Sequence, residues 1–258
     1  MSIRIIDPHI HFQSASLYDL ELMSLSGVNV IVGFSQPTYR FSYPETYFDH
    51  YERLLRFEKA RAESVGIKVY LALGISPKAM IKDPFTVVER LERYLQLDFV
   101  VAIGESGLTN YNDVVELETL KVMFELGRKF KKPVFVDLPN DYRKQAIKKV
   151  EKLAADANIP PELVVLNEID FLTALDVEGL PFWFGFTLWP ESTKNMVENI
   201  FKGDLPLDRV ILSSNFDSLA RDPLALPKTA LELKLKGYDE FILDKVLYEN
   251  PKRLFKLE

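Results

Sequence analysis

The sequence predicts an α/β fold, a (β/α)8 TIM barrel, from the pattern of its apolar residues. Short apolar runs rich in β-branched residues alternate with segments whose apolar residues recur at helix spacing. The runs are continuously apolar, which is typical of parallel strands that are buried on both faces. About eight strand–helix units fit into 258 residues, and this number favours a closed barrel. An open, doubly wound sheet is the alternative, because periodicity does not distinguish a closed sheet from an open one.

Eight apolar runs are predicted as strands, and helical patterns lie between them. The strands are expected at residues 3–6, 28–32, 69–73, 100–103, 134–136, 163–166, 182–186 and 210–212. One helix is expected after the start signal Asp83-Pro84, and another over residues 47–62, where Leu54, Phe57 and Arg61 recur at helix spacing. Further helices are expected near 117–127, 223–236 and 239–249. No low-complexity linker divides the chain, so residues 1–258 are interpreted as a single domain.

Composition and charge exclude several classes of protein. Apolar residues make up 47% and charged residues 27%, which is ordinary for a globular protein. The net charge of −6 does not indicate a protein coated by nucleic acid, although a local basic groove remains compatible with it. The absence of cysteine excludes disulfides, zinc ribbons and thiol nucleophiles. No secretion signal opens the chain and no uncharged run approaches the length of a membrane span, so a cytoplasmic protein is expected. The sequence indicates no oligomeric state.

The first strand leads into an Asp-x-His-x-His motif formed by Asp7, His9 and His11. Only one other histidine, His50, occurs in the chain. Because side chains repeat every second residue along a strand, the three motif residues share one face. Two adjacent imidazoles can bind a divalent metal ion, and their burial without partners would cost about 2–7 kcal/mol for each unsatisfied group. Asp7 is interpreted as a partner that orients an imidazole rather than as a ligand. A surface pair without function is the alternative.

Polar residues follow the strands at the point where each apolar run ends. In chain order they are Asp7, Ser35, Glu105, Asp137, Asn167, Thr187 and Asn215. In a barrel these positions all lie on the C-terminal rim, which is where active sites of this fold are found. The sequence therefore predicts that widely separated residues converge on one pocket.

Several motifs resemble the TatD-related branch of the amidohydrolase superfamily over nearly the full length. They are Asp7-x-His9-x-His11, Gly104-Glu105-Ser106-Gly107-Leu108, Lys132-Pro133-Val134-Phe135-Val136, Trp183-Phe184-Gly185-Phe186-Thr187, the segment 222–228, and Glu249-Asn250-Pro251-x-x-Leu254-Phe255. The chain looks most like the archaeal predicted hydrolases of that group. The resemblance implies a hydrolase that uses one or two divalent ions to activate water against a phosphodiester or related bond.

The resemblance also implies which residues bind the ion. His9 and His11 match the first-strand ligands, and Glu105 matches the bridging carboxylate. The fifth-strand histidine of the family is Asp137 here, and the sixth-strand histidine is Asn167. Two nitrogens and two carboxylate oxygens can still hold one ion such as Zn²⁺, Mn²⁺ or Mg²⁺. An amide oxygen replaces imidazole poorly on zinc, so one ion is expected rather than two. Asp137 is alternatively the N-cap of a helix that starts near residue 140.

The eighth-strand aspartate of the family, which takes a proton from the attacking water, is Asn215 here. An amide cannot accept this proton, and positioned acid–base groups typically contribute about 10²–10⁴ in rate. A metal ion lowers the pKa of bound water to about 7 unaided, so some activity can survive. Asp217 or Glu168 could substitute for the missing base, although both are more simply interpreted as rim residues that face solvent.

Two functions therefore remain open. The first is a metal-dependent hydrolase in which His9, His11, Glu105 and Asp137 hold one ion, and whose substrate is a small-molecule or nucleic-acid phosphodiester or a related ester or amide. The second is a catalytically impaired or inactive barrel that is retained for ligand or partner binding. A purely structural barrel without metal is a third alternative.

Overall fold

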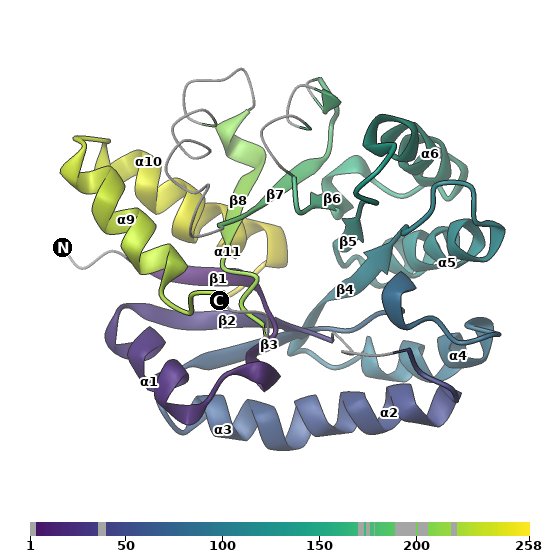
Figure 1. The fold of residues 1–258 in the computed structure, drawn as a ribbon, viewed down its shortest axis with the longest axis horizontal. Helices are drawn as coiled ribbons and strands as arrows, with labels where there is room; N and C mark the ends of the chain where they lie inside the picture. The colour runs from purple at the N-terminus through teal and green to yellow at the C-terminus, as the bar shows by residue number, and fades with distance from the viewer. Residues whose placement is uncertain are drawn as a thin grey trace.

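Eight parallel strands form one sheet whose order in space is their order in the chain (Figure 1). The computed structural model describes residues 4–35, 40–169, 173, 176–177, 179–188, 200, 206–217 and 221–258. The strands are β1 (Ile5–Ile10), β2 (Val28–Phe34), β3 (Lys68–Ala72), β4 (Val100–Gly107), β5 (Val134–Asp137), β6 (Val164–Asn167), β7 (Trp183–Thr187) and β8 (Val210–Ser213). All eight predicted strands are present, within a few residues of their expected bounds.

The sheet closes between its first and last strands. Backbone ladders join each strand to the next from β1 to β8. Beyond the end of β8, the Asn215 nitrogen donates to the His9 carbonyl at 3.0 Å, and the His11 nitrogen donates to the Phe216 carbonyl at 2.8 Å. The predicted TIM barrel is thus confirmed, and the open doubly wound sheet is wrong. Closure also draws the segment after β8 against His9 and His11 at the end of β1.

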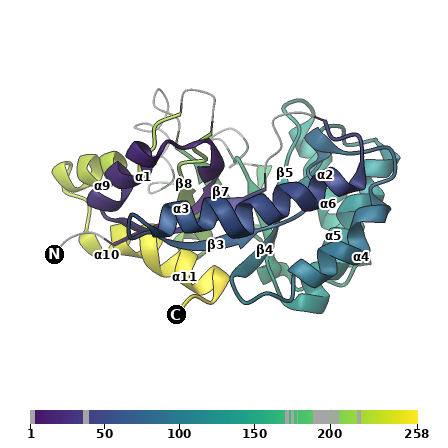
Figure 2. The same cartoon turned by 90° about the horizontal axis from the view of Figure 1, so that it is seen from below.

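Helices lie around the outside of the strands, as Figures 1 and 2 show. They are α1 (Leu17–Leu25), α2 (Pro44–Glu52), α3 (Lys59–Glu63), α4 (Phe85–Tyr94), α5 (Val114–Phe130), α6 (Arg143–Asp156), α9 (Ala225–Leu235), α10 (Glu240–Asp244) and α11 (Asn250–Phe255). Short helical turns are η1 (Phe12–Ser14), η2 (Arg53–Glu58), η3 (Pro77–Ala79), η4 (Pro161–Leu163), η5 (Leu207–Arg209) and η6 (Lys245–Glu249). Within the described residues, no helix combines the length and the apolar character that crossing a membrane requires.

The segment predicted as one helix over 47–62 consists of α2, the π-helical turn η2 and α3. Its buried side chains are Tyr47, Phe48, Tyr51, Leu54, Glu58 and Ala62, whereas Phe57 is 63% exposed. The assignment of Phe57 to the packed face is therefore wrong. A carboxylate occupies the buried position instead, and an apolar pattern cannot reveal this exchange.

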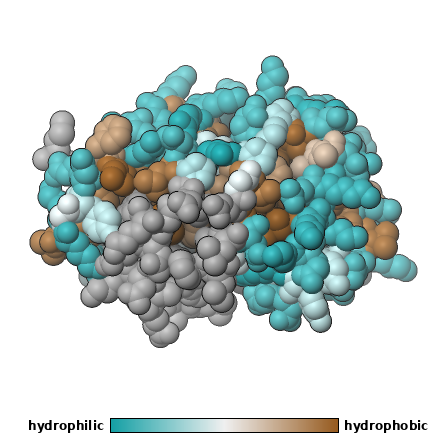
Figure 3. Space-filling model, turned by 90° about the horizontal axis from the view of Figure 1, so that it is seen from above, coloured by the Kyte–Doolittle hydropathy of each residue, from teal (hydrophilic) through white to brown (hydrophobic). Residues whose placement is uncertain are grey.

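Two apolar layers hold the barrel together. One cluster takes side chains from all eight strands and fills the barrel interior, where Phe255 of α11 stacks on Phe135 with ring centroids 5.7 Å apart. The other, larger cluster lies between the strands and the surrounding helices. Phe34 and Phe135 of the inner layer also contact the ring of His9, at centroid distances of 4.0 and 6.1 Å. The inner core thus packs directly against the residues at the strand ends. On the face shown in Figure 3, most exposed side chains are hydrophilic.

Candidate metal centre

His9, His11 and Glu105 converge at the C-terminal ends of β1 and β4. One potential ligand atom from each lies within 4.8 Å of the other two. The Nε2 atoms of His11 and His9 are 3.1 and 3.7 Å from Oε1 of Glu105. All three residues are at most 2% exposed. The structure therefore brings together the three residues that the motifs single out.

The imidazoles are held so that their Nε2 atoms point at this shared space. The Nδ1 atom of His11 is 3.3 Å from the Phe34 carbonyl, which can only accept, so Nδ1 carries the proton and Nε2 the lone pair. Nδ1 of His9 lies against the Asn167 amide, 3.0 Å from Nδ2 and 3.3 Å from Oδ1. Because Nδ2 donates to Asp137, Oδ1 is the atom that can accept the proton of Nδ1. Among the described residues, neither buried Nε2 atom has a hydrogen-bond partner. Two nitrogen lone pairs beside a carboxylate oxygen fit a divalent ion such as Zn²⁺ or Mn²⁺.

Glu105 is ionised in this setting and uses its two oxygens differently. Burial works to raise its pKa, but the adjacent imidazoles of His11 and His9 and the charge of Lys78 outweigh burial and hold the pKa well below its usual range. The Ser76 hydroxyl donates to Oε2 at 3.2 Å. Oε1 is the oxygen that faces the histidines, so one oxygen remains for an ion there.

Asp137 lies beside this cluster and is bound by two other side chains. Its Oδ1 accepts from Nδ2 of Asn167 at 2.9 Å, and its Oδ2 is 3.3 Å from Nζ of Lys78. Burial and the nearby charge of Glu105 raise the pKa of Asp137 to about 7. The helix after β5 begins at Arg143, so the interpretation of Asp137 as an N-cap is wrong. Asp137 and Asn167 do converge on the centre, as predicted for residues at strand ends.

Asp7 has a different role from the one that the sequence suggested. Its carboxylate is fully buried and accepts from the backbone nitrogens of Ser214 at 3.2 Å and His9 at 3.3 Å, and from the Ser214 hydroxyl. Burial raises its pKa to about 7 despite these donors. The interpretation that Asp7 orients an imidazole through its side chain is therefore wrong. It instead fastens β1 to the segment after β8.

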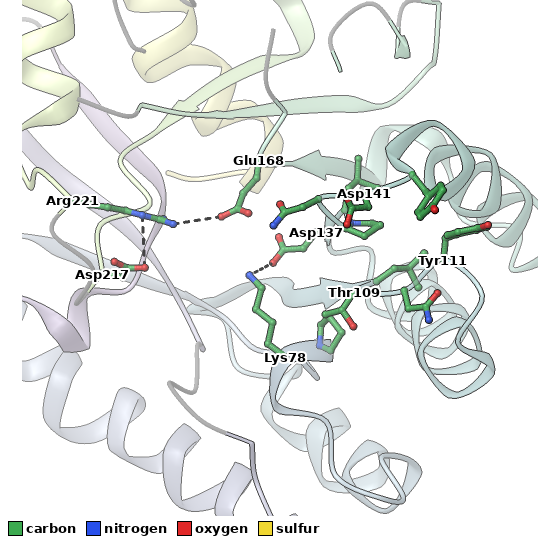
Figure 4. A pocket seen from close by; sticks show the side chains of 15 residues that line it. Lys78, Thr109, Tyr111, Asp137, Asp141, Glu168, Asp217 and Arg221 are labelled. Carbon is green, nitrogen blue, oxygen red and sulfur yellow. Dashed lines mark hydrogen bonds and ion pairs between the residues drawn. The ribbon is translucent and has the colours of Figure 1, made fainter. Parts of the chain in front are cut away.

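Asn215 takes part in a polar network with Glu168 and Arg221. Its Nδ2 donates to Oε1 of Glu168, and Arg221 lies 3.9 Å from the same oxygen and 3.7 Å from Oδ2 of Asp217 (Figure 4). Asp217 is 5% exposed, so its interpretation as a residue that faces solvent is wrong. Glu168 is partly buried, with a side chain 25% exposed. Glu168 and Asn215 have positive φ values of 54° and 44°, a conformation that non-glycine residues adopt mainly where the surroundings impose it.

A pocket of about 740 Å³ opens beside the centre. Its lining includes Lys78, Asp137, Tyr142, Glu168, Asp217 and Arg221, several of which point toward one another in Figure 4. His9, His11 and Glu105 do not line it, so Asp137 connects the buried cluster to the pocket. Of the seven strand-end residues predicted to converge on one pocket, only Asp137 lines it, while the histidine cluster lies beside that pocket.

Sequence reasoning missed Ser76, Lys78 and Arg221. Ser76 follows β3 closely, so the rule that polar residues mark strand ends could have included it. Lys78 lies in the short turn η3, and Arg221 lies beyond the last strand. Neither position carries a periodic or motif signal.

Comparisons with known proteins agree with this geometry. The sequence pattern described as "TatD related DNase" matches residues 6–256. The chain is 32% identical to an uncharacterised metal-dependent hydrolase of Methanocaldococcus jannaschii, over 98% of this chain and 100% of that protein. Similar solved structures are a TatD-like protein of Archaeoglobus fulgidus (TM-score 0.82, 23% identity, covering 98% and 100% of the two chains) and a TatD homologue of Escherichia coli (TM-score 0.68, 18% identity, covering 100% of both).

Proposed function

The chain belongs to the TatD-related DNase family, whose members include metal-dependent hydrolases, and from this premise we propose that it hydrolyses a phosphodiester or a related ester or amide bond with one divalent ion. His9, His11 and Glu105 would hold this ion. One observation carries the proposal: two buried Nε2 atoms without hydrogen-bond partners point at the same carboxylate oxygen. A bound cation would satisfy all three atoms, whose burial unpaired is otherwise costly.

The residues around the ligands would fix their orientation and supply the pocket. When bound, the ion would provide an activated water at neutral pH. The Phe34 carbonyl and the Asn167 amide hold the two imidazoles, which is how partners of metal-bound histidines typically act. The substrate would occupy the pocket that Asp137 connects to the cluster.

A carboxylate in the pocket would accept the proton that Asn215 cannot take. Glu168 and Asp217 are the two candidates, and both line the pocket. Glu168 is the better placed of the two, because its side chain is 25% exposed and the Asn215 amide fixes it, whereas the Asp217 side chain is 3% exposed against Arg221. Asn215 would then position Glu168, the carboxylate that accepts the proton in its place.

The substrate class follows from the family alone. Its description as DNase-related supports a nucleic-acid phosphodiester, and a small-molecule phosphodiester has the same reacting group. Lys78 and Arg221 in the pocket provide cationic groups next to such an anion, although carboxylates neighbour both.

Metal content tests the proposal directly. Purified protein is incubated with Zn²⁺, Mn²⁺ or Mg²⁺, dialysed, and analysed by mass spectrometry for bound metal. We expect about one equivalent in the wild type and a loss of at least tenfold in affinity in His9→Ala. His50→Ala is the matched control, because the third histidine lies outside the cluster and should leave the metal content unchanged. A wild type that stays below about a tenth of an equivalent with all three ions contradicts the proposal.

The second candidate, a barrel that binds a ligand or partner without turnover, is favoured by the amides at Asn167 and Asn215. The double variant Asn215→Asp with Asn167→His separates the two functions on a panel of phosphodiesters and nucleic acids. A silent wild type together with an active double variant would support the inactive barrel. Wild-type turnover that disappears in His9→Ala would eliminate it.

A further inference from the structure

The carboxylate oxygens around the centre are already bound by side chains of this protein. Both oxygens of Asp137 have partners, the Asn167 amide on Oδ1 and the Lys78 ammonium on Oδ2. Oε2 of Glu105 accepts from the Ser76 hydroxyl. Only Oε1 of Glu105 faces the two histidines. The carboxylate oxygens that would have to coordinate a second divalent ion beside the first are therefore occupied.

Lys78 is the cation that reaches these carboxylates from the pocket. It lies in η3, the next element after β3, and its side chain extends to Asp137, as the dashed line in Figure 4 shows. The charges of Asp137, Glu105 and Glu168 raise the pKa of Lys78 above its usual range, Asp137 contributing most. The ammonium is thus a permanent positive charge within electrostatic reach of three carboxylates, two of them buried.

We propose that the ammonium of Lys78 is the second cation of this centre and excludes a second divalent ion from it. The inference rests on the proposed function, because it takes His9, His11 and Glu105 as the site of the first ion. Asp137 is then the partner of Lys78 and not a ligand of that ion. Its position just outside the three-residue cluster agrees with this assignment.

Removal of the Lys78 ammonium should leave a negative charge at Asp137 that a divalent ion can neutralise instead. With Lys78 removed, Asp137 keeps only a neutral amide donor while it stays buried close to the charges of Glu105 and Glu168. A buried carboxylate in that position is costly unless a cation approaches it. Carboxylate oxygens are the ligands that hard ions such as Mn²⁺ prefer. Removal of the ammonium should therefore open a second ion site.

The test is the number of Mn²⁺ ions bound, measured by mass spectrometry after dialysis and by anomalous scattering from crystals. We expect about one equivalent in the wild type and about two in Lys78→Ala, the second ion lying beside Asp137. Lys82→Ala is the matched control, because Lys82 is exposed, lies four residues further on and does not line the pocket. It should bind as many ions as the wild type.

A second pair of variants makes the assignment of Asp137 testable. Asp137→Asn should keep the ion of the wild type, and adding it to Lys78→Ala should remove the second ion again. If Lys78→Ala does not fold, Lys78→Gln retains most of the side chain and carries the same expectation. An unchanged ion count in the neutral variants of Lys78, a wild type with two ions, or loss of the first ion in Asp137→Asn would overturn the inference.

Failure of the two proposals is distinguishable. A wild type that binds no ion contradicts the proposed function, but the difference of about one ion between wild type and Lys78→Ala remains measurable. A wild type with one ion and an unchanged Lys78 variant contradicts only the inference. If neither protein binds an ion, both proposals are wrong.

Discussion

The side chain of Arg61 is expected to contribute strongly to stability because it anchors the segment that follows His11. Its Nη1 donates to the Ala15 carbonyl at 2.7 Å and its Nη2 to the Phe12 carbonyl at 2.9 Å. Arg61 also lies 2.7 Å from Glu58, which is 1% exposed. Arg61→Met therefore leaves two carbonyls without their charged donor and a buried carboxylate with Arg53 as its remaining partner. Each charged hydrogen bond contributes about 1.5–3 kcal/mol, and breaking a buried ion pair costs about 3–5 kcal/mol.

Because these contributions overlap, we expect Arg61→Met to lower the free energy of unfolding by about 3–5 kcal/mol. Urea denaturation followed by circular dichroism measures it. Arg56→Met is the matched control: Arg56 is 82% exposed and pairs with Glu52 one helical turn away, an arrangement that contributes at most about 0.5 kcal/mol. If the two variants differ by less than about 1 kcal/mol, the network around Glu58 does not stabilise the barrel as argued.

Two further predictions concern pH and backbone conformation. Burial lowers the pKa of His50 to about 4 from an ordinary value near 6.5. Between these pH values His50 is therefore protonated in the unfolded chain and neutral in the folded chain. His50 should therefore contribute a loss of about 3 kcal/mol in stability as the pH decreases from 6.5 to 4. Buried Asp7 and Asp137, whose pKa values are raised, change stability in the opposite direction in both proteins, so the measure is the difference between wild type and His50→Phe at several pH values. Gly107 has a φ of 136°, and an added Cβ would lie 2.2 Å from the Asp137 carbonyl, whereas Gly237 has a φ of 82° with nothing within 4 Å. Gly107→Ala should therefore cost about 2–4 kcal/mol against about 1 kcal/mol for Gly237→Ala, and equal melting temperatures would refute the close approach at Gly107.

Much of the fold could be predicted from the sequence because parallel strands buried on both faces leave a strong local signal. Each of the eight apolar runs became a strand, and only the ends differ, as where β4 extends to Gly107. The segment around Phe57 shows where this signal fails. There the buried position belongs to Glu58, whose charge two arginines neutralise, and a pattern of apolar residues cannot anticipate such a pair.

The positions of polar residues at strand ends predicted which residues lie close together. They could not predict the interaction partner of each residue. His9 and His11 stand out because histidine is scarce and a strand repeats every second residue, and these two facts are local. The role of Asp137 depends instead on Lys78, which is 59 residues away in the chain and contacts it at 3.3 Å. A carboxylate at this position favours a metal ion if it is unpaired and an ammonium if a lysine reaches it. The choice between a ligand and an ion-pair partner is therefore made by a tertiary contact, which is why the same residue type at the same strand end can serve either kind of centre.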